Sequence, residues 1–171
     1  MNRHYDPSVF QSIGSLNSAR SAADYESFEQ LLTSFKQVAE SLSYEDQFGL
    51  SLVHRHTHVQ QNKRMMDFHS TLQPITLSPE ATNLHGTPIR PKSYTLKDGF
   101  WMPYEYELGK EFDVSDEFDS FFERVKECVQ RSGLTSIGLR RYSPRDPEEL
   151  EVTEDGGVSI KVPWNSVGQW A

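Results

Sequence analysis

The sequence predicts a single α+β domain in which an antiparallel sheet, built from hairpins, is covered by two helices. Three observations predict this class. Segments 24–42 and 115–133 place apolar residues three and four positions apart, as one buried face of a helix requires. Short alternating segments are separated by turn signals, of which Asp98-Gly99 between two apolar runs is the strongest. The chain of 171 residues also has the length of one domain rather than two.

Residues 1–20 are expected to form an irregular N-terminal arm, in which one helical turn stays open, and residues 21–171 the domain itself. The arm is polar and carries few apolar side chains. The helical pattern begins sharply behind it, where Ser21 or Asp24 can cap the first turn by accepting a hydrogen bond from a backbone N–H. The first helix is therefore expected directly after the arm.

The second helix is expected to begin at Asp113 or Ser115 and to end at Gly133, since glycine readily adopts the left-handed conformation that stops a helix. Its apolar stripe includes Cys128, the only cysteine, which is expected to be a small buried hydrophobe rather than a nucleophile. A single cysteine excludes an internal disulfide and is typical of a reducing compartment.

The strands are expected where alternating segments lie between turn signals. Phe48 to Val59 is predicted to be the first strand, with residues 64–69 as its hairpin partner. The proline-rich stretch 73–91 is expected to be a loop with at most one edge strand. Pro103 places its own strand at an edge or at a bulge. Further strands are expected at 93–96, 100–108, 135–142, 149–153 and 158–162, the last two joined through residues 154–157.

Charge and composition limit the partners. The chain has 17 basic and 25 acidic residues, a net charge of −8 and a pI near 5.2. This balance argues against a nucleic-acid partner or an anionic membrane surface, because both need a cationic field. The sequence shows neither a secretory signal nor the roughly 18 apolar residues of a membrane span, so a cytoplasmic location is expected. The expected partner is a small-molecule ligand, and a homo-oligomer stays open.

The most unusual feature of the sequence is a row of alternating histidines, His54, His56 and His58. In a strand all three would point to one face. Neighbouring members would sit roughly 6 to 7 Å apart at the backbone, which lets two imidazoles reach one ion. The whole row spans about 13 Å, too far for all three to bind a single ion. A complete metal site therefore needs a ligand from elsewhere in the chain.

The candidates to complete such a site are His69 on the predicted partner strand and Glu105 or Glu107, which share one face of the strand 100–108. Two histidines, a third histidine or a carboxylate, and an open position suit a divalent metal such as zinc, iron or manganese. Such a metal would act as a Lewis acid while nearby side chains move protons. The expected ligands are thus His54, His56, and His69 or Glu105, and the expected proton carriers are His58, Tyr106 and Glu107.

Other interpretations of the same residues stay open. The histidines also fit ordinary surface residues that titrate near pH 6.5, or a metal-free acid/base isomerase or lyase with no cofactor. The leading function predicted is binding of a small molecule at the histidine cluster, with metal-dependent isomerase or lyase chemistry in specialised metabolism. A non-catalytic protein-interaction module is a further alternative, with an aromatic surface of Phe100, Trp101, Trp164 and Trp170.

Two charged segments of the predicted strands fit either a ligand site or an ordinary structural role. In Tyr104-Glu105-Tyr106-Glu107, strand alternation favours tyrosines in the core and carboxylates in water, with a ligand pocket as the alternative. Arg140 and Arg141 have the charge to bind a carboxylate or phosphate. Strand geometry would send them to opposite faces, so at most one is expected to point at any given site.

Phe48-Gly49-Leu50-Ser51-Leu52-Val53-His54-Arg55-His56 resembles the Phe-Gly-x-x-Leu-x-His-Arg-His motif of a family of small, largely uncharacterised fungal proteins. Residues 101–107 and the helix end at Ser132-Gly133-Leu134 are similar as well. The resemblance covers most of the chain from Asp24 on. It implies a fungal intracellular protein and brings no established activity. Where relatives have an aromatic, a leucine and then an acidic residue after the motif, this chain has Thr57-His58-Val59 followed by residues 60–64.

Overall fold

The structure is a computed structural model, and it describes residues 5–22, 24–55, 57, 59–60, 62–68, 71–78, 81–110, 115–141, 149–153 and 159–163. These residues contain four helices: α1 (Pro7–Ser12), α2 (Leu16–Ser21), α3 (Tyr25–Ser41) and α4 (Asp116–Ser132). They also contain nine strands: β1 (Phe48–Leu52), β2 (Lys63–Asp67), β3 (Thr71–Thr76), β4 (Asn83–Leu84), β5 (Thr87–Lys97), β6 (Phe100–Leu108), β7 (Ile137–Arg141), β8 (Glu149–Thr153) and β9 (Ser159–Pro163).

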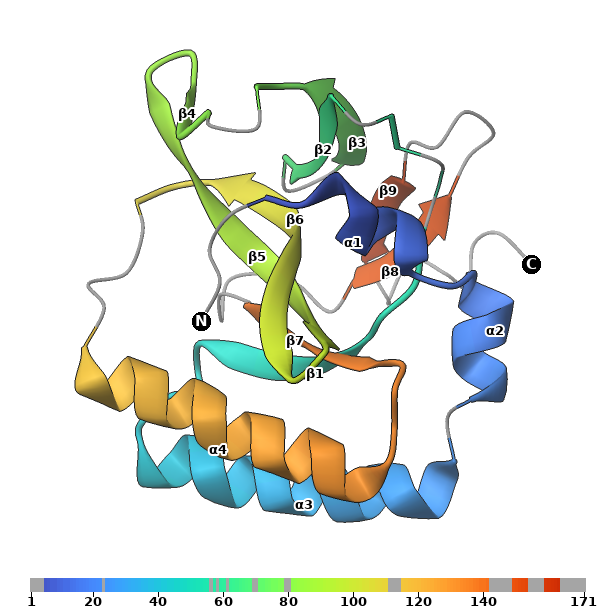
Figure 1. Ribbon diagram of the computed structural model, residues 1–171, viewed down its shortest axis with the longest axis vertical. Helices are drawn as coiled ribbons and strands as arrows, with labels where there is room; N and C mark the ends of the chain where they lie inside the picture. The colour runs from blue at the N-terminus through green and yellow to red at the C-terminus, as the bar shows by residue number, and fades with distance from the viewer. Residues whose placement is uncertain are drawn as a thin grey trace.

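The strands form one open sheet in the order β1-β7-β5-β6-β2-β3-β9-β8, with β4 paired to β5. The described strand pairs are antiparallel except for β2 and β6, which run parallel. Figure 1 shows α3 and α4 side by side below β1 and β7, and α1 against β6 well away from them. The predicted α+β class in a single domain, with a mostly antiparallel sheet, is confirmed.

The two long helices form because their ends are capped locally. Asp24 accepts a 2.8 Å hydrogen bond from the Ser27 N–H at the start of α3. The Ser115 hydroxyl accepts a 3.2 Å hydrogen bond from the Phe118 N–H at the start of α4. Gly133 ends α4 with a φ of 70°. These caps confirm one of the two alternatives predicted for each helix start, and the predicted stop of the second helix.

The core between the helices and the sheet is mainly aromatic. Phe121 and Phe122 of α4 pack against Phe48 of β1, with ring centroids 5.4 and 5.5 Å away. Trp101 of β6 is almost fully buried and donates its indole N–H to the Phe122 carbonyl at 2.8 Å. Cys128 belongs to the same core, which confirms its expected burial.

The N-terminal segment differs from the irregular arm that was expected. Its described part forms α1 and α2, and Asp6 caps α1 by accepting from the Ser8 N–H. Val9 and Phe10 are essentially inaccessible to solvent, and Phe10 packs against the Tyr104 ring. Few apolar side chains are enough to dock this segment, because nearly all of them point into the sheet.

Strands are present in both predicted segments, 48–59 and 64–69, but the first is shorter than predicted and the hairpin between the two is wrong. β1 ends at Leu52 and pairs with β7, whereas β2 pairs with β3 and β6. After one further bond, from the Val53 N–H to the Ser136 carbonyl, the chain leaves the sheet. Arg55 then bridges to Ser15 in the N-terminal segment. The alternating pattern continues past the strand because Val53 and Val59 are buried against α1 rather than within a strand.

The proline-containing segments also form more strand than expected. The stretch 73–91 contains most of β3, all of β4 and the start of β5. Pro103 lies in a central strand, where Tyr94 opposes it beside a register shift between β5 and β6. The bulge expected there is therefore confirmed, and the edge position is not.

Both hairpins predicted from glycine turns are present. Asp98 and Gly99 join β5 to β6 with φ angles of 51° and 79°, as a tight hairpin turn requires. β8 and β9 pair over five residues each. In the part of the chain that the structure describes, no helix has the length and apolar character to cross a bilayer.

Candidate functional site

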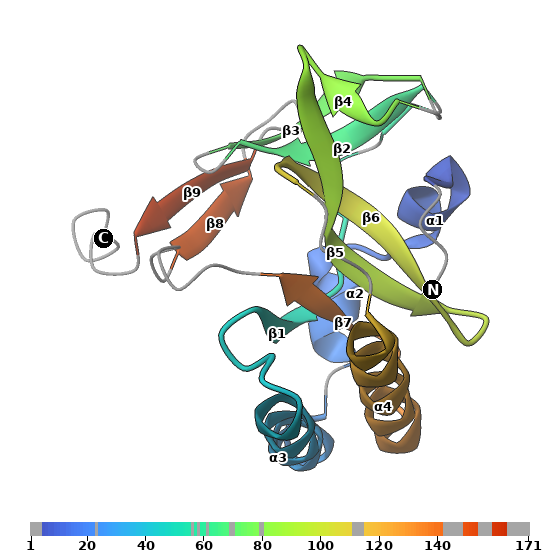
Figure 2. The ribbon, with the colours of Figure 1, turned by 90° about the vertical axis from the view of Figure 1, so that its left-hand side faces the viewer.

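Charged residues from four strands meet at one end of the sheet. β2, β6 and β7 all end there, and the first half of β5 runs between β6 and β7, as Figure 2 shows from that side. Asp67 of β2 lies opposite Glu107 of β6, and Arg140 of β7 lies opposite Ser93 of β5. We call the seven ionisable residues gathered there the charged cluster: Asp67, Arg90, Lys92, Glu105, Glu107, Arg140 and Arg141.

The centre of the charged cluster is a buried ion pair between Lys92 and Asp67. The Lys92 ammonium lies 2.9 Å from Asp67 Oδ2, and the two side chains are only 3% and 1% exposed. Glu107 Oε2 lies 3.5 Å from the same ammonium. Burial alone would lower the pKa of Lys92, but attraction to Asp67 and Glu107 outweighs it and raises the pKa. Lys92 is therefore a charged donor rather than a general base.

Glu105 is the second buried carboxylate. Its side chain is 2% exposed, and its Oε2 accepts a 2.6 Å hydrogen bond from the Ser93 hydroxyl. Arg140 links it to the central pair, with one guanidinium nitrogen 3.8 Å from Glu105 and another 3.3 Å from Asp67. The chain thus buries two carboxylates where each is met by a donor, which keeps the cost of desolvation tolerable.

Glu107 lies nearer the surface and contacts three cations. Its Oε1 accepts from Arg90 Nε at 2.7 Å and lies 3.9 Å from a nitrogen of Arg141. Burial and the positive charge of Arg90 lower the pKa of Arg141 to about 10. The guanidinium groups of Arg90 and Arg141 therefore lie close to the same carboxylate oxygen and repel each other.

Two irregularities of the ladder shape the cluster. Between the pairs Pro91–Tyr106 and Tyr94–Pro103, the register skips Lys92 on β5 and Tyr104 on β6. Such bulges turn a side chain away from strict alternation. Burial and the charge of Glu105 raise the pKa of the Tyr104 phenol, which keeps it neutral beside the cluster.

The structure brings two of the predicted site residues together and separates a third. Glu105 and Glu107 both lie in the charged cluster, so the expectation of carboxylates in water is wrong. Tyr106 is on the other face of β6. Its ring centroid lies 5.8 Å from that of Tyr5 and 5.2 Å from the guanidinium carbon of Arg64. Burial raises the pKa of Tyr106 as well. Tyr106 and Glu107 therefore do not share a site.

His54 lies away from the carboxylates. In the strand pairing, Glu105 lies opposite Ser93, Ser93 opposite Arg140, and Arg140 opposite Gly49 of β1. From Gly49, β1 runs roughly 10 Å along the sheet, away from this row, before it ends at Leu52. The Nδ1 of His54 lies 2.9 Å from the Leu52 carbonyl. His56, His58 and His69 lie outside the described residues. Within the described residues, no group of three histidine, cysteine or acidic side chains is placed to hold a metal.

The predicted aromatic surface also differs. Phe100 is exposed, but Trp101 is buried in the core, because the side chains of neighbouring strand residues point to opposite faces. Trp164 and Trp170 lie outside the described residues. The part of this surface that can be located is therefore a single aromatic side chain.

Sequence reasoning missed Asp67, Arg90, Lys92 and Ser93, and it placed Arg140 and Arg141 on opposite faces. Both arginines in fact contact carboxylates of the cluster, because Arg141 is the last residue of β7 and its long side chain reaches Glu107. One signal was available: β2, β6 and β7 each carry charged residues near their C-terminal ends, after apolar ones.

Comparison of the chain with models of protein families, with curated proteins and with solved structures finds no match in any of the three. The resemblance to the fungal family stays a prediction.

Proposed function

We propose that this chain is a small cytoplasmic protein that binds a polar small molecule at the charged cluster. One observation carries the proposal: seven ionisable side chains from four strands meet at one place, and Asp67, Lys92 and Glu105 are almost completely buried there. Apolar side chains of similar size would fold at least as well in such positions. Buried charge that stability does not need is typical of functional sites.

The cluster has the groups that a polar ligand requires. The cations supply fixed donors, and Glu107 is a carboxylate with an 11% exposed side chain. Glu107 is therefore the group best placed to accept a hydroxyl or to move a proton, which supports isomerase or lyase chemistry of the kind expected from the sequence. Ser93 and Tyr104 are neutral hydroxyls beside the second carboxylate, Glu105.

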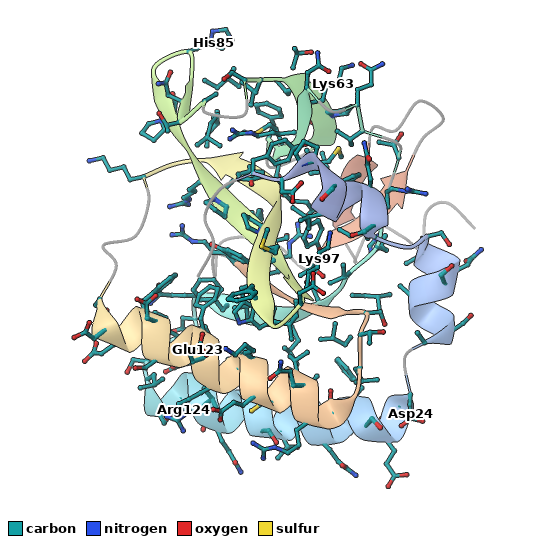
Figure 3. The ribbon with its side chains drawn as sticks, in the orientation of Figure 1. Asp24, Lys63, His85, Lys97, Glu123 and Arg124 are labelled. Atoms are coloured by element: carbon teal, nitrogen blue, oxygen red, sulfur yellow. The ribbon has the colours of Figure 1, made fainter. Side chains whose placement is uncertain are left out.

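The test is a titration of the uniformly ¹⁵N-labelled full chain with single compounds of different charge: succinate, inorganic phosphate, glucose and spermidine. We expect at least one compound to give saturable shifts at the amides of Ser93, Glu105 and Arg140. The Arg124→Gln variant is the control: Arg124 lies in α4 of the helical layer (Figure 3), so this variant should give the same shifts as the wild type. Saturable shifts at none of these amides would overturn the proposal.

A second candidate is a divalent metal site at the histidines, supported by one contact. A carbonyl can only accept, so the contact with Leu52 fixes a hydrogen on His54 Nδ1. Metal-ligating histidines commonly donate from the second nitrogen in this way. Elemental analysis by plasma mass spectrometry should find near-stoichiometric zinc, iron or manganese, lost in the His54→Ala/His56→Ala double variant. Metal-free wild-type protein would refute this candidate.

A further inference from the structure

Among the residues that the structure describes, the charged cluster contains more cations than carboxylates, although the whole chain is strongly negative. With all seven groups ionised, four cations (Arg90, Lys92, Arg140 and Arg141) face three carboxylates (Asp67, Glu105 and Glu107), which leaves one positive charge. The chain as a whole has a net charge of −8. These described cations lie close enough together, around the same carboxylates, to contact a single bound group.

The cluster has two layers that differ in access to water. Asp67, Lys92 and Glu105 form the buried layer. The side chains of Arg140, Arg90 and Arg141 are 27%, 22% and 16% exposed, so the solvent-facing layer consists mainly of guanidinium groups. Guanidinium groups match the paired oxygens of carboxylates and phosphates, with two parallel hydrogen bonds in a fixed geometry.

One of these guanidinium groups is held in place before any ligand arrives. Arg90 donates through Nε to Glu107 and through Nη1 to the Lys110 carbonyl at 2.8 Å. Gly109 makes room for it: a Cβ at this position would lie 2.7 to 3.0 Å from three atoms of the guanidinium. A donor fixed on the backbone loses little entropy on binding, which favours affinity.

We propose that the ligand carries an anionic group, a carboxylate or a phosphate, and that Arg90, Arg140 and Arg141 bind it. This rests on the proposed function and names the chemical class of its ligand. Arg90 and Arg141 both lie near the same oxygen of Glu107, and an anion placed beside them offsets the repulsion between the two guanidinium groups. Lys92 holds Glu107 and Asp67 from behind, so that the carboxylates stay in place when the anion binds.

The experiment compares ligands that differ in charge and little in shape. The ¹⁵N-labelled chain is titrated with succinate, with its neutral diamide, succinamide, and with inorganic phosphate, at an ionic strength held constant with sodium chloride. We expect saturable shifts at the amides of Ser93, Gly109 and Arg141 with succinate or phosphate and not with succinamide. The relative affinity for succinate and phosphate then distinguishes a carboxylate from a phosphate ligand.

Two variants connect the binding to the guanidinium. Arg141→Gln should weaken the anion at least tenfold, and Arg141→Lys, which keeps the charge and loses the fork, should weaken it less. Arg124→Gln should leave the affinity unchanged. If Arg141→Gln fails to fold by circular dichroism, the lysine variant and the wild-type shift map decide the question.

The possible failures differ. Equal binding of succinate and succinamide, or anion binding that Arg141→Lys leaves unchanged, overturns the anion assignment and keeps the small-molecule site. Binding of glucose or spermidine without any anion does the same. Saturable shifts with none of these compounds overturn both the anion assignment and the proposed function.

Discussion

Asp67→Asn is the most direct test of the charged cluster, because it removes one charge at its centre and almost no volume. Asp67 is 1% exposed and lies within 2.9 Å of the Lys92 ammonium and 3.3 Å of the Arg140 guanidinium. The variant leaves Lys92 charged and buried, with Glu107 at 3.5 Å as its remaining described carboxylate. We therefore expect a large loss of folding stability.

The size of the loss follows from the burial of the pair. Removing one partner of a buried ion pair costs about 3 to 5 kcal/mol. The asparagine oxygen can still accept a hydrogen bond from Lys92, so we expect the lower end, about 3 kcal/mol. For a chain of this size, each kcal/mol lowers the thermal midpoint by roughly 2 to 4 °C, which gives a fall of roughly 6 to 12 °C.

The assay is urea unfolding, followed by tryptophan fluorescence to which the buried Trp101 contributes, together with thermal unfolding followed by circular dichroism. The matched control is Glu123→Gln, the same chemical change in a surface pair. Glu123 is 59% exposed, pairs with Lys126 and lies in α4 (Figure 3). This control should lose less than about 1 kcal/mol. If Asp67→Asn loses no more than Glu123→Gln, the buried Lys92 charge does not depend on Asp67 as argued.

Three further predictions concern single residues. Gly109→Ala should weaken anion binding several-fold because its Cβ meets the Arg90 guanidinium, whereas Gly86→Ala, also at a positive φ (82° against 155°) but in open space, should leave binding unchanged in the same titration. The pKa of Lys92 is raised above its usual 10.5, so its stabilisation is complete below pH 10.5 and is lost as the pH rises further. The stability difference between wild type and Lys92→Met should therefore stay constant from pH 7 to pH 9 in urea titrations and shrink above pH 10.5. Burial raises the pKa of the Cys128 thiol, so an aromatic disulfide reagent should label it only at the rate of unfolding; fast labelling of the native protein would refute its burial.

The two long helices, α3 and α4, could be predicted from the sequence because their signals are local. Asp24, Ser115 and Gly133 each act within a few residues of their own position, so one segment contains both the cause and the effect. The same holds for the hairpin at Asp98-Gly99, where the turn brings its own two strands together.

The strand partners and the charged cluster could not be predicted in this way. Alternation shows that a segment is buried on one side, and it does not show which segment pairs with it, so the prediction ran past the end of β1 at Leu52. Asp67 and Arg140 are 73 residues apart in the chain and meet only because β5 and β6 bring β2 and β7 together. A single sequence contains no local signal for such a contact.

The charged cluster can be separated from the stability of the fold by removing its central pair completely. The double variant Asp67→Leu/Lys92→Met removes both members of the central pair, so that neither is left as an isolated buried charge. Most of the loss caused by Asp67→Asn should therefore be recovered, and the chain should unfold near the wild-type midpoint. The anion site should nevertheless fail, because Glu107 and Arg140 lose the groups that hold them. Wild-type stability together with a large loss of succinate or phosphate affinity would show that these charges serve binding. Wild-type stability with unchanged affinity would show that the ligand, if one binds, does not depend on the centre of the cluster.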